Sequence, residues 1–255
     1  MRDPATPGPR RTALVTGAST GIGRATALDL ARHGYDVAIA DLPGVPLDAV
    51  ADHPGLGGAR MLPLPLDLRS LASIEACIAA AVQGLGGLDV LVNNAGTQLR
   101  GPAVEIDWHD WDALMAVNLK GQYFMATRFA RHCMAAGRPG AIVSTASTHG
   151  LTGIAGQSVY GIAKGGVIQM TRMLAVEWAG AGIRVNAVAP ATVLTPSRAA
   201  ALSDPARRQM MLERLPTRRF PTAEEVAAAI RFLAAAENAS VTGHILPVDG
   251  GLLAV

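Results

Sequence analysis

A tyrosine and a lysine that could carry out proton transfer lie one helical turn apart in this chain of 255 residues, at Tyr160 and Lys164. Side chains four residues apart share a face of a helix. A free phenol has a pKa of about 10, too high for acid–base chemistry near neutral pH, but a cation held nearby favours the phenolate and lowers that pKa. A shift to about 7 needs roughly 4 kcal/mol of differential stabilisation. The pair is therefore a candidate proton carrier with its activator.

A glycine-rich turn near the start of the chain could hold a pyrophosphate. It reads Thr-Gly-Ala-Ser-Thr-Gly-Ile-Gly over residues 16–23, between a short apolar run and an amphipathic segment. Glycines let the backbone approach a pyrophosphate, and the N-terminus of the following helix presents N–H groups to it. The alternative is a glycine-capped turn without a ligand, but the strand-turn-helix context favours a dinucleotide. The candidate residues are Gly17, Ser19, Thr20, Gly21, Ile22 and Gly23.

Asp41 ends the second expected strand and bears on which dinucleotide binds. An acid there can accept hydrogen bonds from the adenosine ribose hydroxyls, and it repels a 2′-phosphate by on the order of 4 kcal/mol at about 4 Å and an effective dielectric near 20. Neither Leu42 nor Thr20 offers such a phosphate a positive charge. The sequence predicts NAD rather than NADP, unless Asp41 is only a turn residue before Pro43.

Two further groups follow the third and fourth expected strands. Asp67, next to Leu68, could bind the adenine amino group or cap the helix that begins near Ser70. The run Asn-Asn-Ala-Gly at 93–96 follows the fourth strand, and the carboxyl ends of strands line the ligand crevice of such sheets. We expect backbone at these positions to lie against the cofactor, at Asn94, Ala95 and Gly96.

Strand-like and helical segments alternate over the whole chain. This alternation predicts a single doubly wound Rossmann-type α/β domain over residues 11–255, with a mostly parallel seven-stranded sheet and helices on both faces. Pro63 and Pro65 confine the third strand to an edge of the sheet. The expected strands are Thr12–Val15, Asp36–Ala40, Met61–Leu66, Leu88–Val92, Ala141–Thr145, Ile183–Ala189 and His244–Val248, and the expected helices are Gly21–His33, Leu71–Gln83, Asp107–Ala136, Ser158–Ala179 and Thr222–Ala236.

Two segments depart from this alternation. Residues 1–10 are rich in proline and lack an apolar signal core, so we expect a disordered lead-in. Residues 191–221 contain several prolines and arginines and no clear period. A long irregular insert in a compact domain is usually a binding loop, so we expect a substrate lid there rather than a mobile surface excursion.

Composition argues against several classes of function. The formal net charge of +2 and the scattered basic residues argue against nucleic-acid binding. No apolar run is as long as a membrane span, and the dispersed histidines argue against a metal site. Cys77 and Cys133 lie in apolar helical patterns, so we expect buried, reduced thiols and a cytoplasmic protein.

Together these residues make the chain resemble the short-chain dehydrogenase/reductase family over Thr12–Gly251. The resemblance rests on the glycine turn, the run at 93–96, and Asn118, Ser147, Tyr160 and Lys164. It implies that Tyr160 exchanges a proton with the substrate oxygen, while Lys164 lowers the pKa of Tyr160 and binds the nicotinamide ribose. Ser147 would hydrogen-bond the substrate oxygen, and Asn118 would hold a water that links Lys164 to solvent. Such a division suits hydride transfer, which needs a proton carrier and a donor to oxygen beside a nicotinamide.

The chain departs from the family pattern after the sixth strand, where Pro190-Ala191 replaces the usual Pro-Gly. Because Ala191 has a Cβ, this turn cannot easily adopt a positive φ, and the path of residues 192–195 is left open. The resemblance implies that Val193 offers its backbone, and Thr195 its hydroxyl, to the nicotinamide side of the cofactor.

The resemblance also places a substrate pocket after the fourth, fifth and sixth strands. Its mostly polar candidates favour a sugar, polyol or small hydroxy compound. His149 could instead be a packing or capping residue, and Arg198 could be solvated. The candidates are Gln98, Ser147, His149, Leu151, Gln157 and Thr192, with Arg198 on the lid.

An NAD-dependent alcohol or sugar dehydrogenase is the leading interpretation. An NADPH-dependent 3-oxoacyl-thioester reductase is an alternative, because arginines over 207–219 could meet a carrier protein, although Asp41 argues against it. A non-catalytic dinucleotide sensor would not need Tyr160 and Lys164. The resemblance further implies a homodimer or homotetramer, in which the helices at 107–136 and 158–179 pair across a two-fold axis and residues 242–255 form a second interface.

Overall fold

The computed structural model describes residues 10–195 and 203–255. The lead-in predicted at 1–10, apart from its last residue, lies outside these ranges, and so does Arg198 of the predicted lid.

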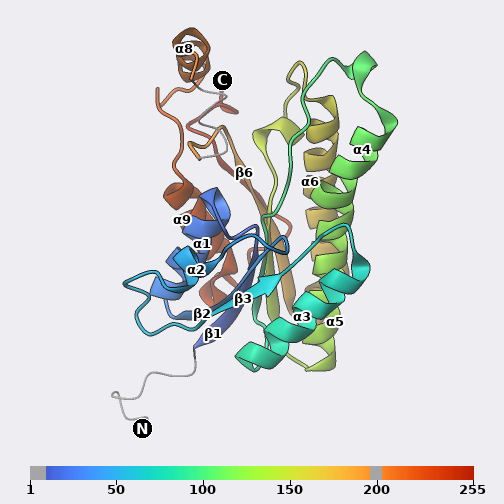
Figure 1. Ribbon diagram of the computed structural model, residues 1–255, viewed down its shortest axis with the longest axis vertical. Helices are drawn as coiled ribbons and strands as arrows, with labels where there is room; N and C mark the ends of the chain where they lie inside the picture. Colours follow the sequence, from blue (N-terminus) through green and yellow to red (C-terminus); the bar gives the residue numbers. More distant parts are fainter. Residues whose placement is uncertain (1–9, 196–202) are drawn as a thin grey trace.

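Seven parallel strands form one sheet in the order β3-β2-β1-β4-β5-β6-β7 (Figure 1). The chain enters at β1, runs outward to β3, returns to β4 beside β1, and then continues outward to β7. This order confirms the doubly wound Rossmann-type prediction, and the crossover between β1 and β4 creates a crevice at the carboxyl ends of the strands. The strands are Arg11–Thr16, Tyr35–Asp41, Met61–Pro65, Val90–Asn93, Gly140–Thr145, Ile183–Pro190 and Ile245–Val248.

Helices cover both faces of the sheet (Figure 1). Leu14 packs with the layer of α3, α5 and α6, whereas its neighbours Ala13 and Val15 pack with α1 and α9. Because both faces are covered, the central strands read as continuous apolar runs. The bounds are α1 Gly21–Arg32, α3 Leu71–Leu85, α5 Gln122–Ala135, α6 Ser158–Trp178 and α9 Ala223–Ala234.

The edge position predicted for the third strand is correct. β3 pairs with β2 alone among the described strands, and Pro63 lies opposite Ile39. A proline lacks the N–H that a second neighbour would need, so the strand is tolerated where one side has no partner strand.

The long helical region predicted at 107–136 is interrupted at one turn. α4 (Trp108–Met115) is followed by the π-helical turn η2 (Ala116–Gly121), which leads directly into α5. Such turns are rare and often mark functional sites. Asn118 lies within η2.

The segment expected to be irregular over 191–221 contains a helix, so that prediction was wrong in part. α8 (Pro205–Glu213) begins after Asp204, whose side chain accepts a hydrogen bond from the backbone N–H of Ala206. An aspartate cap followed by proline at the first helical position is a helix start signal that the arginine-rich composition obscured.

Short elements complete the chain: α2 (Asp48–Ala51), η1 (Ala103–Glu105), η3 (Thr148–Gly150), η4 (Ala179–Ala181) and η6 (Ala236–Asn238). Among the helices that the structure describes, none has both the length and the hydropathy to cross a bilayer.

Candidate active site

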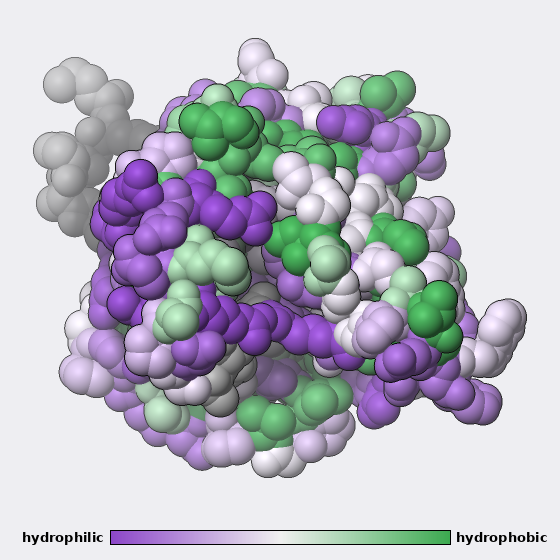
Figure 2. All heavy atoms as spheres, turned by 90° about the horizontal axis from the view of Figure 1, so that it is seen from above, coloured by the Kyte–Doolittle hydropathy of each residue, from purple (hydrophilic) through white to green (hydrophobic). Residues whose placement is uncertain are grey.

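A cavity of about 640 Å³ lies at the carboxyl ends of the strands. Figure 2 looks down on this end of the molecule and shows hydrophilic and hydrophobic surface around a hollow. Most of the predicted cofactor residues line it, together with Gln98, Ser147, His149 and Thr192 from the predicted substrate set. The lining cofactor candidates are Gly17, Ser19, Thr20, Gly21, Ile22, Asp41, Leu42, Asp67, Leu68, Asn94, Ala95, Gly96, Tyr160, Lys164, Pro190, Val193 and Thr195.

Of the predicted residues that the structure describes, four lie outside the lining: Gly23, Asn118, Leu151 and Gln157. Gly23 has a packing role, because a Cβ there would lie 2.0 Å from the carbonyl oxygen of Gly17. Its absence lets α1 approach the turn closely, as the third glycine of a dinucleotide fold does. Leu151 is 42% exposed, and Gln157 precedes the first turn of α6.

The glycine turn has the features of an anion site. Gly17 and Gly21 have φ of 65° and 55°, values that residues with a Cβ rarely adopt. Thr20, the residue before α1, makes no side-chain hydrogen bond to the helix. The first N–H groups of α1 are therefore available to an anion at the helix N-terminus.

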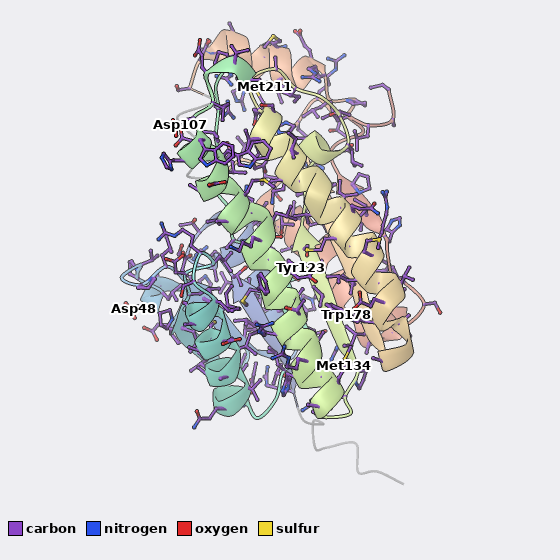
Figure 3. The ribbon with its side chains drawn as sticks, turned by 90° about the vertical axis from the view of Figure 1, so that its right-hand side faces the viewer. Asp48, Asp107, Tyr123, Met134, Trp178 and Met211 are labelled. Atoms are coloured by element: carbon purple, nitrogen blue, oxygen red, sulfur yellow. The ribbon has the colours of Figure 1, made fainter. Side chains whose placement is uncertain are left out.

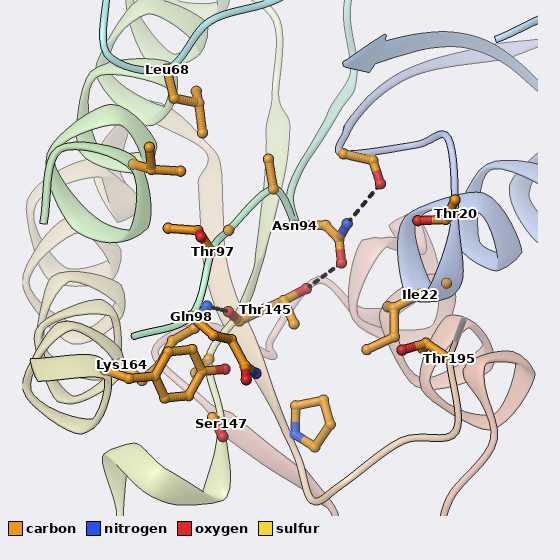
Figure 4. Close-up of a pocket in the computed structure, with 18 of the residues that line it drawn as sticks. Thr20, Ile22, Leu68, Asn94, Thr97, Gln98, Thr145, Ser147, Lys164 and Thr195 are labelled. Atoms are coloured by element: carbon orange, nitrogen blue, oxygen red, sulfur yellow. Dashed lines mark hydrogen bonds between the residues drawn. The ribbon is translucent and has the colours of Figure 1, made fainter. Parts of the chain in front are cut away.

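Asn94 ties this turn to the neighbouring strands (Figure 4). Its Nδ2 donates to the carbonyl oxygens of Thr16 at 3.0 Å and Gly17 at 3.2 Å, while its Oδ1 accepts from Thr145 Oγ1 at 3.3 Å. The hydroxyl oxygen of Thr16 in turn accepts from the backbone N–H groups of Asn94 and Ala95. The turn and the run at 93–96 thus form one hydrogen-bonded unit.

Asp41 is held in place by backbone donors. One carboxylate oxygen accepts from the N–H of Ser19 at 3.1 Å, and the other accepts from the N–H of Leu42 at 2.9 Å. Each carboxylate oxygen can accept a second hydrogen bond, so Asp41 can also serve hydroxyl groups in the cavity that it lines.

Asp67 is paired with a residue that the sequence reasoning missed. Its carboxylate accepts from the Arg69 backbone N–H at 2.9 Å and from Nε and Nη2 of the same side chain at 2.9 and 2.7 Å. These hydrogen bonds lower the pKa of Asp67. Ser70, rather than Asp67, caps α3 by accepting from the Ser73 N–H, so the capping alternative was wrong. Arg69 itself lines the cavity.

Tyr160 and Lys164 both face the cavity from α6. The ammonium nitrogen lies 5.7 Å from the centre of the Tyr160 ring and donates to the carbonyl oxygen of Thr145 at 2.6 Å. Lys164 is 3% exposed, and this burial lowers its pKa to about 8. The cation is thus placed beside the phenol at an energetic cost that the fold must offset.

Ser147 follows β5 and orients its hydroxyl through the next turn. Its Oγ accepts from the backbone N–H of His149 at 3.2 Å, at the start of η3. A serine that accepts in this way still has its hydroxyl hydrogen to donate. The ring of His149 meets the ring of Tyr160 edge-on, with centroids 5.8 Å apart.

Asn118 binds the loop after β4 with both ends of its side-chain amide. Its Oδ1 accepts from the Thr97 N–H at 2.7 Å, and its Nδ2 donates to the Thr97 carbonyl oxygen at 2.8 Å. A Cβ on Gly96 would lie 3.3 Å from Asn118 Oδ1 and 3.8 Å from Lys164 Nζ. Asn118 therefore holds the loop after β4 against the lysine, and its predicted water link stays a prediction.

The turn after β6 accepts alanine without strain. Arg218 is the one non-glycine residue with positive φ in the described chain, so Ala191 keeps an ordinary conformation. Its N–H donates to the carbonyl oxygen of Val248 at 3.2 Å. Thr195 lies against the glycine turn, because a Cβ added to Gly21 would lie 3.0 Å from its Cγ2.

The arrangement fits a nicotinamide dinucleotide. One side of the cavity, near Thr20 and Ile22 in Figure 4, has the glycine turn, where added Cβ atoms would fill the space for a ligand. The uncapped N-terminus of α1 and the hydrogen-bonded carboxylate of Asp41 belong to the same side. Gln98, Ser147 and Lys164 lie on the other side. One side can hold phosphates and a ribose, and the other can exchange a proton with a substrate oxygen.

Comparison with known proteins agrees with this geometry. Residues 17–253 match the model of a family described as enoyl-(acyl carrier protein) reductase. A 3-oxoacyl-(acyl-carrier-protein) reductase of Thermotoga maritima is 42% identical over 241 residues, which cover 94% of this chain and 96% of that protein. The 2-dehydro-3-deoxy-D-gluconate 5-dehydrogenase of Escherichia coli is 36% identical over 244 residues, 96% of each chain.

A similar crystal structure is described as that of a 2-deoxy-D-gluconate 3-dehydrogenase from Agrobacterium tumefaciens with bound NADP. It is 40% identical, superposes with a TM-score of 0.89, and the match covers 96% of this chain and 97% of that one.

Proposed function

The chain belongs to the short-chain dehydrogenase/reductase family, and on that premise we propose that it transfers a hydride between NAD and a secondary alcohol or its ketone. The observation that carries the proposal is the position of Ser147, Tyr160 and Lys164 along one cavity with the glycine turn. When bound, the nicotinamide ring supplies the hydride chemistry.

The protein's own groups would handle the proton and the oxygen charge. The Ser147 hydroxyl, held by the N–H of His149, donates to the substrate oxygen. The Tyr160 hydroxyl takes the proton from an alcohol or returns it to the oxygen in the reverse direction. Lys164 is charged below its pKa of about 8, and its ammonium favours the phenolate form of Tyr160.

Asp41 supports NAD over NADP. Its carboxylate lines the cavity and is fixed by two backbone N–H groups, so it cannot move away from a 2′-phosphate without losing them. The bound NADP of the Agrobacterium structure leaves this preference to experiment. We expect kcat/KM to be at least tenfold higher with NAD than with NADP. Equal or reversed values would contradict the assignment.

A sugar, polyol or small hydroxy compound is the proposed substrate. Gln98, His149 and Thr192 line the same cavity as Ser147 and can hydrogen-bond the hydroxyl groups of such a substrate. The Escherichia coli and Agrobacterium proteins are both described as acting on sugar acids. Turnover on a panel of aldoses, polyols, hydroxy acids and acyl thioesters tests the proposal. Activity on acyl thioesters alone would refute this substrate class.

A 3-oxoacyl-thioester reductase remains the second candidate, because the Thermotoga relative carries that description. Arg207 and Arg208 on α8 could meet an acidic carrier protein. Reduction of acetoacetyl-CoA with NADPH, faster than any turnover of polyols with NAD, would favour this candidate.

We also propose that the chain assembles into a homotetramer in the cytoplasm. α5 and α6 lie side by side on one face (Figure 3). On these two helices Tyr123 is 43% exposed, Met173 60% and Val176 82%. Large apolar side chains gathered on one face are typical of an interface. Light scattering at micromolar concentration tests the assembly, and a monomeric mass would contradict it.

A further inference from the structure

The turn η3 and the helix α6 touch through their backbones. A Cβ on Gly150, in η3, would lie 2.7 Å from the carbonyl carbon of Lys164 and 2.8 Å from the nitrogen of Gly165. These atoms belong to a helix backbone and cannot rotate aside as a side chain can. Gly150 therefore permits an approach that any other residue would prevent.

Two glycines of α6 face the same turn. A Cβ on Gly161 would lie 3.0 Å from the carbonyl oxygen of His149, which is a tight contact, and one on Gly165 would lie 3.7 Å from the carbonyl oxygen of Gly150, which is an ordinary one. At the contact between η3 and α6, an added Cβ is therefore closest to its neighbours at Gly150, less close at Gly161 and at an ordinary distance at Gly165.

The contact matters because its two sides carry different parts of the proposed chemistry. Ser147 is bound to η3 twice, since its Oγ accepts from the His149 N–H at 3.2 Å and its carbonyl oxygen accepts from the Gly150 N–H at 3.0 Å. Tyr160 and Lys164 are carried by α6. The separation of turn and helix therefore fixes the separation of the serine and tyrosine hydroxyls.

We propose that Gly150, assisted by Gly161, is a positioning residue that sets the Ser147 hydroxyl against Tyr160. The inference rests on the proposed function for the chemistry of that pair. The contact itself is a feature of the fold and can be tested without turnover.

An added Cβ at position 150 moves the turn rather than the helix. α6 spans 21 residues, ten of them buried, and Lys164 is tied to Thr145 at 2.6 Å. η3 is three residues long. The shorter and less anchored element yields, so Ser147 moves while Lys164 and the cofactor side of the cavity stay in place.

The experiment compares four alanine variants at Gly150, Gly161, Gly165 and Gly153. Gly153 follows the same turn, but a Cβ there meets nothing within 4 Å, so its variant is the matched control. With the panel substrate turned over fastest, we expect kcat to fall on the order of a hundredfold in Gly150→Ala, as when an oxyanion donor is lost, and about tenfold in Gly161→Ala. Gly165→Ala and Gly153→Ala should stay within about twofold of wild type.

Two further readouts separate positioning from general damage. The pH midpoint of kcat and the Kd of NADH, measured by protein fluorescence, should match wild type in Gly150→Ala and Gly161→Ala because α6 has not moved. A shifted midpoint or a weakened Kd would mean that the helix yields, and it would overturn the inference. If Gly150→Ala does not fold, kcat is compared between Gly161→Ala and Gly165→Ala. A lower kcat in Gly161→Ala supports the inference, and equal values overturn it.

Hydrogen exchange tests the contact independently of turnover. The His149 N–H is bonded to Ser147 Oγ, so the peptide covering 146–152 should exchange faster in Gly150→Ala than in Gly153→Ala. If no panel compound is turned over, the proposed function fails, but this exchange difference still tests the positioning contact. Equal exchange and equal kcat in these two variants would refute it.

Discussion

The two ends of the cavity hold their charges in different ways. At the proposed adenosine end, the side chain of Arg69 is 61% exposed and pairs with Asp67, two residues earlier in the sequence. At the proposed substrate end, Lys164 is 3% exposed and donates to the carbonyl oxygen of Thr145 in β5. Exposed charges are screened and individually weak, whereas a buried cation acts strongly on its neighbours. We therefore expect the open end to select the cofactor and the buried end to carry the chemistry.

The largest expected effect comes from removing the proton carrier at the buried end. We expect Tyr160→Phe to lower kcat on the order of a thousandfold, because a positioned acid–base group contributes about 10²- to 10⁴-fold. The Kd of NADH, measured by fluorescence titration, should change little, since the aromatic ring remains. Turnover near that of wild type would mean that the assignment of the proton carrier is wrong.

The buried cation should be visible in stability. Burial lowers the pKa of Lys164 from 10.5 to about 8, so the folded state binds fewer protons than the unfolded state between those values. Stability from this group therefore rises as pH increases from about 8 to about 10.5, by about 3 kcal/mol at most.

Lys164→Met should be more stable than wild type at pH 7, and this difference should shrink as pH approaches 10. Urea unfolding at pH 7, 8, 9 and 10 measures it, with Lys120→Met, on the π-helical turn, as the control. A difference that does not depend on pH would contradict the lowered pKa.

A smaller effect is expected at the open end from Asp41→Asn. Removing the carboxylate charge should raise kcat/KM for NADP relative to NAD by roughly thirtyfold, because salt screens an open site below the full repulsion of on the order of 4 kcal/mol. In the wild-type protein, the ratio of kcat/KM with NAD to kcat/KM with NADP should fall as ionic strength increases. A ratio unchanged by the substitution would show that Asp41 does not select the cofactor.

Arg69→Ala should have the smallest effect. We expect the Kd of NAD at pH 7 to change by less than about threefold, because exposed ion pairs contribute little. The substitution should raise the pKa of Asp67, which its hydrogen bonds with Arg69 hold down. An NMR titration of the Asp67 carboxyl carbon measures this shift. A large loss of NAD affinity would instead place Arg69 among the main cofactor contacts.

Sequence alone predicted the sheet and most of the residues that line the cavity, because both depend on local patterns. Strands buried on both faces are continuous apolar runs, and the glycine turn, the run at 93–96 and the Tyr160–Lys164 pair are contiguous motifs. The edge position of β3 followed from two prolines. In these cases the physical cause lies within a few residues.

The features that were missed depend on contacts between distant segments or on competing signals. Gly150 matters through its distance to Lys164, and no local pattern encodes that approach. Gln157 was expected at the substrate because it lies in the segment after the fifth strand, but it lies outside the cavity lining. The start of α8 at Asp204 and Pro205 was detectable from its capping residues.

The π-helical turn at Ala116–Gly121 joins α4 to α5 without a break. A deletion from a regular α-helix rotates everything before it by about 100°, since 3.6 residues make one turn, whereas a π-helical turn already holds one residue more than an α-helical turn. Deleting one residue from this wide turn would restore a regular helix and keep its hydrogen bonds. The same deletion would turn Asn118 away from Thr97. A change that makes the helix regular would therefore remove the two hydrogen bonds that hold the loop after β4 beside Lys164.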